Sequence, residues 1–544
     1  MLTRITGGRI IDPVSVRDGV GDLWVRNERI IDPPANEAAD HTIDAGGCVV
    51  MAGAIDVHSH IAGGNVILAR LLLPELHVSE TAGDPNLPFS TARWSAFETG
   101  RLYARMGYTT VIEPALVPNA ALATHLELDD IPLIDRGGLS VLGNDDQLLS
   151  LLRQKAGPAA ARDLVALTLA TSRGLGVKVI NAGGAAAFKE NIRAFGLDDV
   201  VPSYDLTSRQ ILGALLDAVE SIGVPHPLHV HCSNLGLPGA ADTLIATMDA
   251  AEGRRVHFAH AQFYSYARHE EGGFSSAAAE ICSALAGHPN VTMDVGQVVF
   301  GQTTTISLDI LRQFSGRKAG RPRKWILADG DAEGGGIVPY NYRRKNGVNA
   351  LQFAIGLELF LRSPDPWRVL MTTDHPNGGP FTAYPRLIHL LMNKAERDRT
   401  LAELPAVAHE RSGLQAIERE YSLADIAVMT RAAPARLLGL SDRGNLKSGA
   451  RADIAVYRDS DDRTAMFSCA EAVLKDGVLI VRNGEPLCWR AGKTLTLAPE
   501  FDPAIRRHAD RYLAERFGEG LQSFAVPQAA FGERQVFEVE PCRN

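Results

Sequence analysis

Lysine is scarce in this chain of 544 residues: only ten of its 55 basic residues are lysine, and none of them precedes Lys155. Cysteine is scarce too. The six cysteines lie far apart without a Cys-x-x-Cys pair, which excludes a zinc ribbon, a redox dithiol and a disulfide scaffold. The sequence also lacks the ~18 uninterrupted apolar residues of a membrane span and the apolar segment of a secretory signal. These absences predict a folded cytoplasmic protein with reduced thiols.

An excess of positive charge is also missing. The formal net charge is −9 and the isoelectric point is near 6.0, so the surface offers little attraction to a phosphate backbone or to anionic lipid. The share of hydrophobic residues, 45%, lies in the ordinary globular range. We therefore expect small solutes or other proteins as partners, and neither nucleic acid nor a membrane.

The pattern of short apolar runs divides the chain into three parts. Residues 1–52 alternate β-type runs with Gly and Asp turns, and residues 440–500 return to this pattern, so we expect one composite β domain of the sandwich kind. Between residues 53 and 439, short strands alternate with longer Ala- and Leu-rich helical stretches, which is typical of a parallel α/β sheet or barrel. The last part, residues 501–544, has no strong period and is expected to be a contact arm.

Three polar, Gly- or Pro-rich insertions interrupt the central alternation. They span residues 73–90, 271–276 and 329–349. Insertions of this kind are typical of loops over the mouth of a barrel, where binding residues gather, so we expect these three segments to be loops.

A His-x-His pair follows the apolar run Ala54-Ile55-Asp56-Val57. In extended chain, alternate side chains share a face, so His58 and His60 point the same way with Cα atoms roughly 6.6 Å apart. At this spacing two imidazoles can bind one metal. Two surface histidines with this spacing remain the alternative.

Two later apolar strands also end in histidine. His231 ends the run that begins at Leu228, and His260 follows Val256 and its neighbours. Catalytic residues of a barrel come from the carboxyl ends of its strands. We therefore place His231 and His260 at the site and give the earlier His229 and His257 packing or supporting roles.

An aspartate ends the last apolar run, Trp367–Met371, and is followed by His375-Pro376-Asn377-Gly378-Gly379. A carboxylate in this position can bind a metal and can also take a proton from bound water. Asp374 is therefore a candidate for both roles. A helix N-cap is the alternative for this residue.

One of the rare lysines, Lys178, lies in a run of β-branched residues, Gly176-Val177-Lys178-Val179-Ile180. A buried lysine loses its charge or finds partners, because burial lowers its pKa. A neutral amine there could carry CO₂ as a carbamate that bridges two cations. A lysine that forms a salt bridge at a strand end is the alternative.

Together, the His-x-His pair, the lysine, the two strand-end histidines and the final aspartate resemble the amidohydrolase superfamily. Segments Thr430–Leu440 and Gly444–Ile454 also look like this family's exit from the barrel into the β domain. The resemblance implies a (β/α)₈ TIM-type barrel with two divalent metals, a bridging hydroxide and a bridging N6-carboxylated lysine. Carried over residue by residue, it assigns the ligands as follows: His58, His60 and Asp374 for the first metal, His231 and His260 for the second, and Lys178 as the bridge. Zinc is favoured, and manganese and iron accept the same ligands.

Four segments resemble a narrower group, the amidohydrolase-type subunits of formylmethanofuran dehydrogenases and of bacterial formyltransferase/hydrolase complexes. They are Gly176–Gly184, His229–Gly236, His257–Phe263 and Thr372–Pro380. The resemblance implies hydrolysis of an N-formyl amine on a furan-type C1 carrier to formate and free amine, with a formyltransferase and further subunits as partners. The Arg-rich, Lys-poor composition favours the bacterial kind. Asp374 would move the proton, and Asn234 and Gln262 are expected to orient the amide.

Two other functions remain open at this point. A cyclic-amide hydrolase of the dihydroorotase or hydantoinase kind would use the same metal ligands. A barrel without catalysis could serve as an assembly platform, although the presence of all six expected ligand positions argues against this reading.

Overall fold

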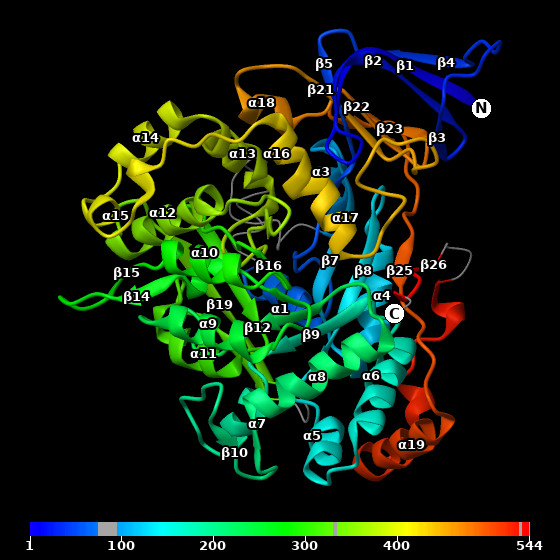
Figure 1. Ribbon diagram of the computed structural model, residues 1–544. Coiled ribbons are helices and arrows are strands. Elements are labelled where there is room, and N and C mark those ends of the chain that lie inside the picture. The colour runs from blue at the N-terminus through cyan, green and yellow to red at the C-terminus, as the bar shows by residue number, and fades with distance from the viewer. Residues whose placement is uncertain (74–94, 330–333, 532–535, 543–544) are drawn as a thin grey trace.

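A closed barrel of parallel strands forms the centre of the molecule in a computed structural model that describes residues 1–73, 95–329, 334–531 and 536–542 (Figure 1). Its strands, in order around the barrel, are β6 (Ala54–Asp56), β7 (Tyr108–Leu116), β8 (Asp135–Leu142), β9 (Gly176–Ile180), β12 (Leu228–His231), β13 (Val256–Phe258), β16 (Val291–Asp294) and β20 (Val369–Leu370). A parallel bridge between Ser59 and His375 closes the ring, and the His60 backbone N–H donates to the His375 carbonyl at 2.7 Å. The expected (β/α)₈ barrel is confirmed.

The barrel strands are buried on both faces because helices cover them from outside. All residues of β8, β9, β12 and β13 are buried. The outer ring includes α3 (Ala96–Arg105), α4 (Ala121–Asp129), α6 (Pro158–Ser172), α8 (Ser208–Ile222), α9 (Ala240–Ala250), α10 (Ala278–Gly287), α12 (Gly347–Arg362) and α13 (Tyr384–Met392). Shorter helices are α1 (Gly64–Leu72), α5 (Asp146–Arg153), α7 (Gly184–Lys189), α11 (Ile310–Gly316), α14 (Lys394–Ala402), α15 (Val407–Glu410), α16 (Leu423–Ala427), α17 (Ala433–Leu437) and α18 (Arg463–Ser468).

Helix α8 shows how local sequence sets these elements. Thr207 and Gln210 form a reciprocal capping box at its start, and Gly223 ends it in the left-handed conformation that glycine adopts without strain. Between them, Ile211, Leu215 and other apolar side chains form a buried stripe toward the sheet.

A second sheet joins the two ends of the chain. It contains β1 (Leu2–Asp12), β2 (Arg17–Arg26), β3 (Arg29–Ile31), β4 (His41–Asp44), β5 (Cys48–Ala52), β21 (Ile454–Arg458), β22 (Ala472–Lys475), β23 (Val478–Arg482) and β24 (Glu485–Pro486). Strand β21 pairs antiparallel with β5, so that Ala455 lies opposite Met51. Figure 1 shows the blue N-terminal strands and the orange C-terminal strands together at the top of the molecule. The two β segments that the sequence indicated thus share one sheet and its own apolar core.

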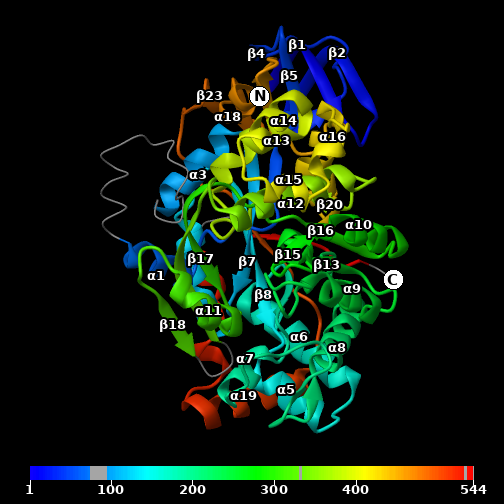
Figure 2. The same cartoon turned by 90° about the vertical axis from the view of Figure 1, so that its left-hand side faces the viewer.

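The chain then returns to the barrel. Strand β25 (Thr494–Thr496) pairs parallel with β8, and β26 (Val536–Glu538) pairs with β25, while helix α19 (Pro503–Phe517) packs on α6. Figure 2 shows α19 at the end of the molecule opposite the β domain. The boundary expected at residue 500 groups β25 with the β domain, whereas its hydrogen bonds belong to the barrel sheet.

Two of the expected mouth loops contain short strands. Strands β14 (Tyr266–Arg268) and β15 (Phe274–Ser276) form a hairpin, and β17 (Gly301–Ser307), β18 (Ile326–Asp329) and β19 (Gly334–Tyr342) form a three-stranded insert. Gly336 suits this sheet because a Cβ atom there would lie 2.6 Å from Gln313 and 2.8 Å from Leu327. The third expected loop lies outside the described residues apart from Leu73. A further pair, β10 (Val200–Val201) and β11 (Leu206–Thr207), stands alone. None of the helices in the described ranges is long and apolar enough to cross a bilayer.

Candidate metal centre at the barrel mouth

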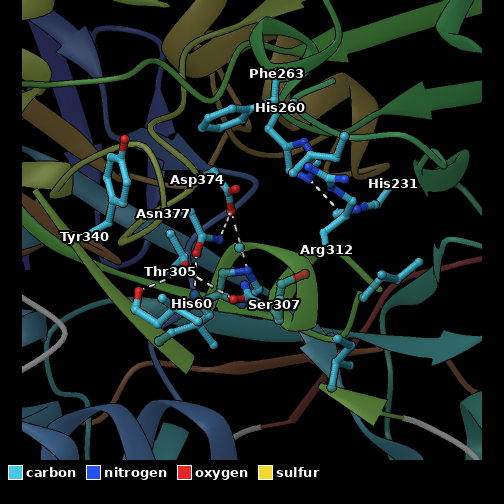
Figure 3. A pocket seen from close by; sticks show the side chains of 18 of the residues that line it. His60, His231, His260, Phe263, Thr305, Ser307, Arg312, Tyr340, Asp374 and Asn377 are labelled. Atoms are coloured by element: carbon cyan, nitrogen blue, oxygen red, sulfur yellow. Dashed lines mark hydrogen bonds and ion pairs between the residues drawn. The ribbon is translucent and has the colours of Figure 1, made fainter. Parts of the chain in front are cut away.

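The carboxyl ends of the barrel strands surround a cavity of about 220 Å³. All six ligand positions expected from the sequence line it: His58, His60, Lys178, His231, His260 and Asp374. The close-up in Figure 3 shows His60 and Asp374 on one side of the cavity and His231 and His260 on the other. The fold therefore brings together residues that lie more than 300 positions apart in the sequence.

His58, His60 and Asp374 converge on one point. The Nε2 atoms of His58 and His60 lie 3.0 and 3.4 Å from the same Oδ1 atom of Asp374. All three side chains are buried, and their ligand atoms lie within 4.8 Å of one another. Asn377 Nδ2 donates to Asp374 Oδ1 at 2.9 Å and helps to fix the carboxylate. The expectation that His58 and His60 share a face agrees with this geometry.

His231 and His260 form a second pair on neighbouring strands. His231 Nδ1 and His260 Nε2 are 3.0 Å apart, and the Tyr264 ring stacks on the His260 ring. Burial lowers the pKa of both imidazoles below the ordinary histidine value. Neutral imidazoles keep a lone pair free, which is the form that binds a metal.

Carboxylates hold the outer nitrogen of three of these four histidines. Asp294 Oδ2 lies 3.1 Å from His58 Nδ1, Glu113 Oε1 lies 3.0 Å from His60 Nδ1, and Asp309 Oδ2 lies 3.2 Å from His231 Nε2. Such partners fix the ring orientation of metal-binding histidines and raise their basicity. The inner nitrogens are thereby directed at the cavity, which supports a metal centre.

Sequence reasoning missed these three carboxylates. Glu113 lies inside the apolar strand β7, and Asp294 ends the buried strand β16. A single acid in an apolar strand was the available signal. Asp309 gave less, because it lies in an insertion between strands and caps helix α11.

The acids also explain the charge state of the first group. Burial opposes ionisation of His60, but Glu113 and Asp374 outweigh it and raise its pKa to about 9. Burial would likewise raise the pKa of Asp374, yet the neighbouring His58 and His260 hold it well below the ordinary carboxyl value. The group thus has an excess of negative charge that attracts a cation, as a metal site requires.

Lys178 projects from β9 into the same cavity and is 2% exposed. Burial lowers its pKa from 10.5 to about 8, although Asp294, Asp374 and Glu113 act in the opposite direction. Within the described ranges no carboxylate forms an ion pair with this amine. The alternative of a salt-bridged lysine therefore does not apply among the residues that the structure describes.

His229 and His257 lie beneath the site. His229 Nε2 is 3.2 Å from His58 Nδ1, and His257 Nε2 is 3.2 Å from Asp294 Oδ2. His58, His229 and Asp294 also lie close enough together to hold a metal. However, neither His229 nor Asp294 lines the cavity, so we place the metal centre at the mouth and give this lower cluster a supporting role.

Asn234 and Gln262 do not line the cavity. Asn234 Nδ2 donates to Thr243 Oγ1 at 3.1 Å, and Gln262 Nε2 donates to the Tyr266 hydroxyl at 2.6 Å. Substrate binding by these two amides stays a prediction. Other polar side chains form the wall: Thr305, Ser307, Arg312, Tyr340, Gln352 and Asn377.

Comparison with known proteins agrees with this site. The model of the Amidohydrolase family matches residues 41–486. The first-lettered component of the formyltransferase/hydrolase complex Fhc of Methylorubrum extorquens is 62% identical over the full length of both chains. Protein FwdA of Methanocaldococcus jannaschii is 37% identical over 98% of both chains.

Solved structures give the same grouping. A chain of the Methylorubrum extorquens FhcABCD complex, crystallised with methylofuran, superimposes with a TM-score of 0.95 and 61% identity, covering 99% of this chain and 100% of that one. A D-aminoacylase superimposes with a TM-score of 0.51 over 90% of this chain and 99% of its own, at 13% identity. At that identity the second likeness concerns the fold alone.

Proposed function

The chain belongs to the amidohydrolase family, and from that premise we propose that it is the hydrolase subunit of a formyltransferase/hydrolase complex of one-carbon metabolism. Its substrate is the N-formyl amide of a methylofuran-type carrier, and its products are formate and the free amine. The observation that carries this proposal is the convergence of all six expected ligand positions on one cavity, in a chain 62% identical from end to end to its relative in the Fhc complex.

Two divalent metals fit the residues at the mouth. We assign the first to His58, His60 and Asp374 and the second to His231 and His260. Three of the histidines already have a carboxylate behind the ring, and the first group has the negative charge that a cation needs. Bound metals of this kind polarise a carbonyl oxygen and lower the pKa of water toward ~7. Zinc is the metal we favour.

Lys178 suits the bridging position. It reaches the cavity from β9, between the strands that bear the two ligand groups, and burial holds the pKa of its amine at about 8. An uncharged amine adds to CO₂ and loses a proton, which converts the side chain into an anionic carbamate. Its two oxygens could then serve one ligand group each.

Asp374 moves the proton in this proposal. Its carboxylate is ionised and is fixed by His58, His60 and Asn377 at the edge of the cavity. It takes a proton from the attacking water at a carboxylate oxygen and passes it to the leaving amine nitrogen. The buried wall limits access of bulk water to this step.

A cyclic-amide hydrolase is less well supported. Two dihydroorotases match only 61 and 62 residues of the chain, about 11% of it. The relatives that match along the whole chain belong to the formyl-carrier group.

The test is formate release by the chain purified together with its partner subunits. We expect N-formylated methylofuran-type amine to give one formate per free amine, and metal analysis to find about two divalent ions per chain. Absence of formate from metal-loaded protein would contradict the proposal. Turnover of dihydroorotate instead would support the cyclic-amide alternative.

A further inference from the structure

Arg312 brings a guanidinium to the wall of the mouth cavity. The residue lies in the first turn of α11, whose start is tied to the site through Asp309. One carboxylate oxygen of Asp309 lies 3.2 Å from His231 Nε2, and the other accepts the backbone N–H of Arg312 at 3.2 Å. The position of Arg312 is thus linked to the second histidine pair, and Figure 3 shows its side chain near His231.

This guanidinium has no counter-ion among the described residues. None of them forms an ion pair or hydrogen bond with its side chain, and the Nε atom is buried without a partner. Asp374 is the carboxylate on the cavity wall, and His58 and His60 occupy it. Burial lowers the pKa of Arg312, although Asp309 and Tyr264 act in the opposite direction. A guanidinium keeps its charge under such conditions.

A desolvated cation without a partner is costly, so its place is explained best by an anion that binds there. Arginine presents a planar fork of donors that matches the two oxygens of a carboxylate. The neighbouring wall contains Leu235 and Phe263, whose apolar side chains strengthen an electrostatic contact. The site therefore suits a small planar monoanion.

We propose that Arg312 binds the carboxylate of formate, the product of the hydrolysis proposed above, beside the second histidine pair. The reaction adds water to a neutral amide: the C–N bond breaks, a C–O bond forms, and one proton goes to the amine, so RNHCHO and H₂O give HCOO⁻ and RNH₃⁺. The carboxylate exists only after the C–N bond has broken. Arg312 therefore distinguishes product from substrate and sets how tightly formate is held. This inference rests on the proposed function.

The experiment compares three variants of the metal-loaded complex: Arg312→Gln, Arg312→Lys and Arg323→Gln. Arg323 is exposed on the same insertion and does not line the cavity, so its variant removes an equal charge elsewhere. Labelled formate is the probe, and equilibrium dialysis gives its dissociation constant without turnover. We expect Arg312→Gln to weaken formate binding about tenfold or more, Arg312→Lys to weaken it about threefold, and Arg323→Gln to leave it unchanged.

Product inhibition provides the second measurement. The inhibition constant of formate should rise in Arg312→Gln by the same factor as the dissociation constant, whereas that of neutral formamide should not change. Equal formate binding in Arg312→Gln and the parent protein would overturn the proposal. So would a raised KM for the formylated carrier with an unchanged formate constant, because it would assign Arg312 to an anionic group of the carrier.

The two proposals fail in different ways. If the complex releases no formate from the formylated carrier, the proposed function fails, while dialysis still shows whether Arg312 binds the anion. If formate release is normal and binding does not depend on Arg312, only the inference about Arg312 fails.

Discussion

Two buried lysines with opposite surroundings lie at the two ends of the barrel. Lys178 at the mouth has no ion pair within the described ranges, and burial lowers its pKa to about 8. Lys475 near the start of β8 has its Nζ atom 3.0 Å from both carboxylate oxygens of Asp453 and 3.1 Å from Asp135. Burial opposes ionisation here too, but Asp135, Asp453 and other acids outweigh it and raise the pKa of Lys475.

The difference teaches what a buried charge signifies. We call the ion network around Lys475 the foot cluster; its members are Asp135, Arg443, Arg451, Asp453, Lys475, Asp476 and Lys493. Its charges neutralise one another, and it joins the barrel to the β domain. The mouth cluster has nitrogen and oxygen ligands that face a cavity and lack neutralising partners. Burial alone thus does not identify a functional group, whereas burial without a partner beside a cavity does.

Asp374→Asn should have the largest effect on the mouth cluster. The amide keeps the size of the side chain but can neither accept the proton nor supply the negative charge, so we expect kcat for formate release to fall about 10³- to 10⁴-fold. Steady-state kinetics with the formylated carrier measures this, and circular dichroism checks that the fold is retained. Activity within tenfold of the parent would remove Asp374 from the proton path.

Lys475→Met should break the foot cluster without affecting the chemistry. Removal of one partner leaves buried carboxylates of Asp135 and Asp453 uncompensated, so the free energy of unfolding should fall by about 3–5 kcal/mol. Denaturant unfolding measures the loss, and kcat of the folded protein should stay at the parent value. The matched Lys178→Met variant should unfold at nearly the parent denaturant concentration.

Lys178→Ala should show the converse pattern. We expect formate release to fall about 10²- to 10³-fold, since the bridging anion is lost, and short carboxylates such as acetate to restore part of it in the space left by the side chain. Full activity without added carboxylate would rule out a carbamate bridge. Lys475→Ala with the same additives is the control, because no rescue is expected at the foot cluster.

Glu113→Gln should give the smallest effect of the four. The glutamine can still contact the His60 ring but has no charge to orient it and raise its basicity, so metal affinity should fall about 10- to 100-fold. Competition with a chromophoric chelator measures this change. Glu127→Gln is a suitable comparison, because Glu127 lies on α4, binds Arg70 and the Gly63 backbone N–H, and does not contact the four mouth histidines.

The sequence predicted the barrel and the six mouth residues because strand ends leave periodic signals. His58 and His60 stand two residues apart after an apolar run, and His231 and Asp374 also end such runs. Lys178 was visible because lysine is rare and seldom lies among β-branched residues. Each of these signals is local to one strand, and the parallel fold brings the strand ends together.

Other features depend on contacts that no local pattern reveals. The roles of Glu113 and Asp294 became clear only from the histidines that their strands face. The Gly-rich segment at 334–336 favoured a loop, whereas the neighbouring strands make it part of β19. Strand β26 is only three residues long and gains its hydrogen bonds from β25, so its sequence had no period to detect.

The seam at which the barrel closes also determines when the first ligand group can exist. His60 and Asp374 lie on the two sides of the Ser59–His375 bridge, 314 positions apart in the chain. A ribosome therefore has to pass residue 374 before these ligands can meet, whereas His231 and His260 are available much earlier. Since chains fold from the amino end during synthesis, metal loading of the first group reports completion of the barrel, and a truncated chain cannot acquire it.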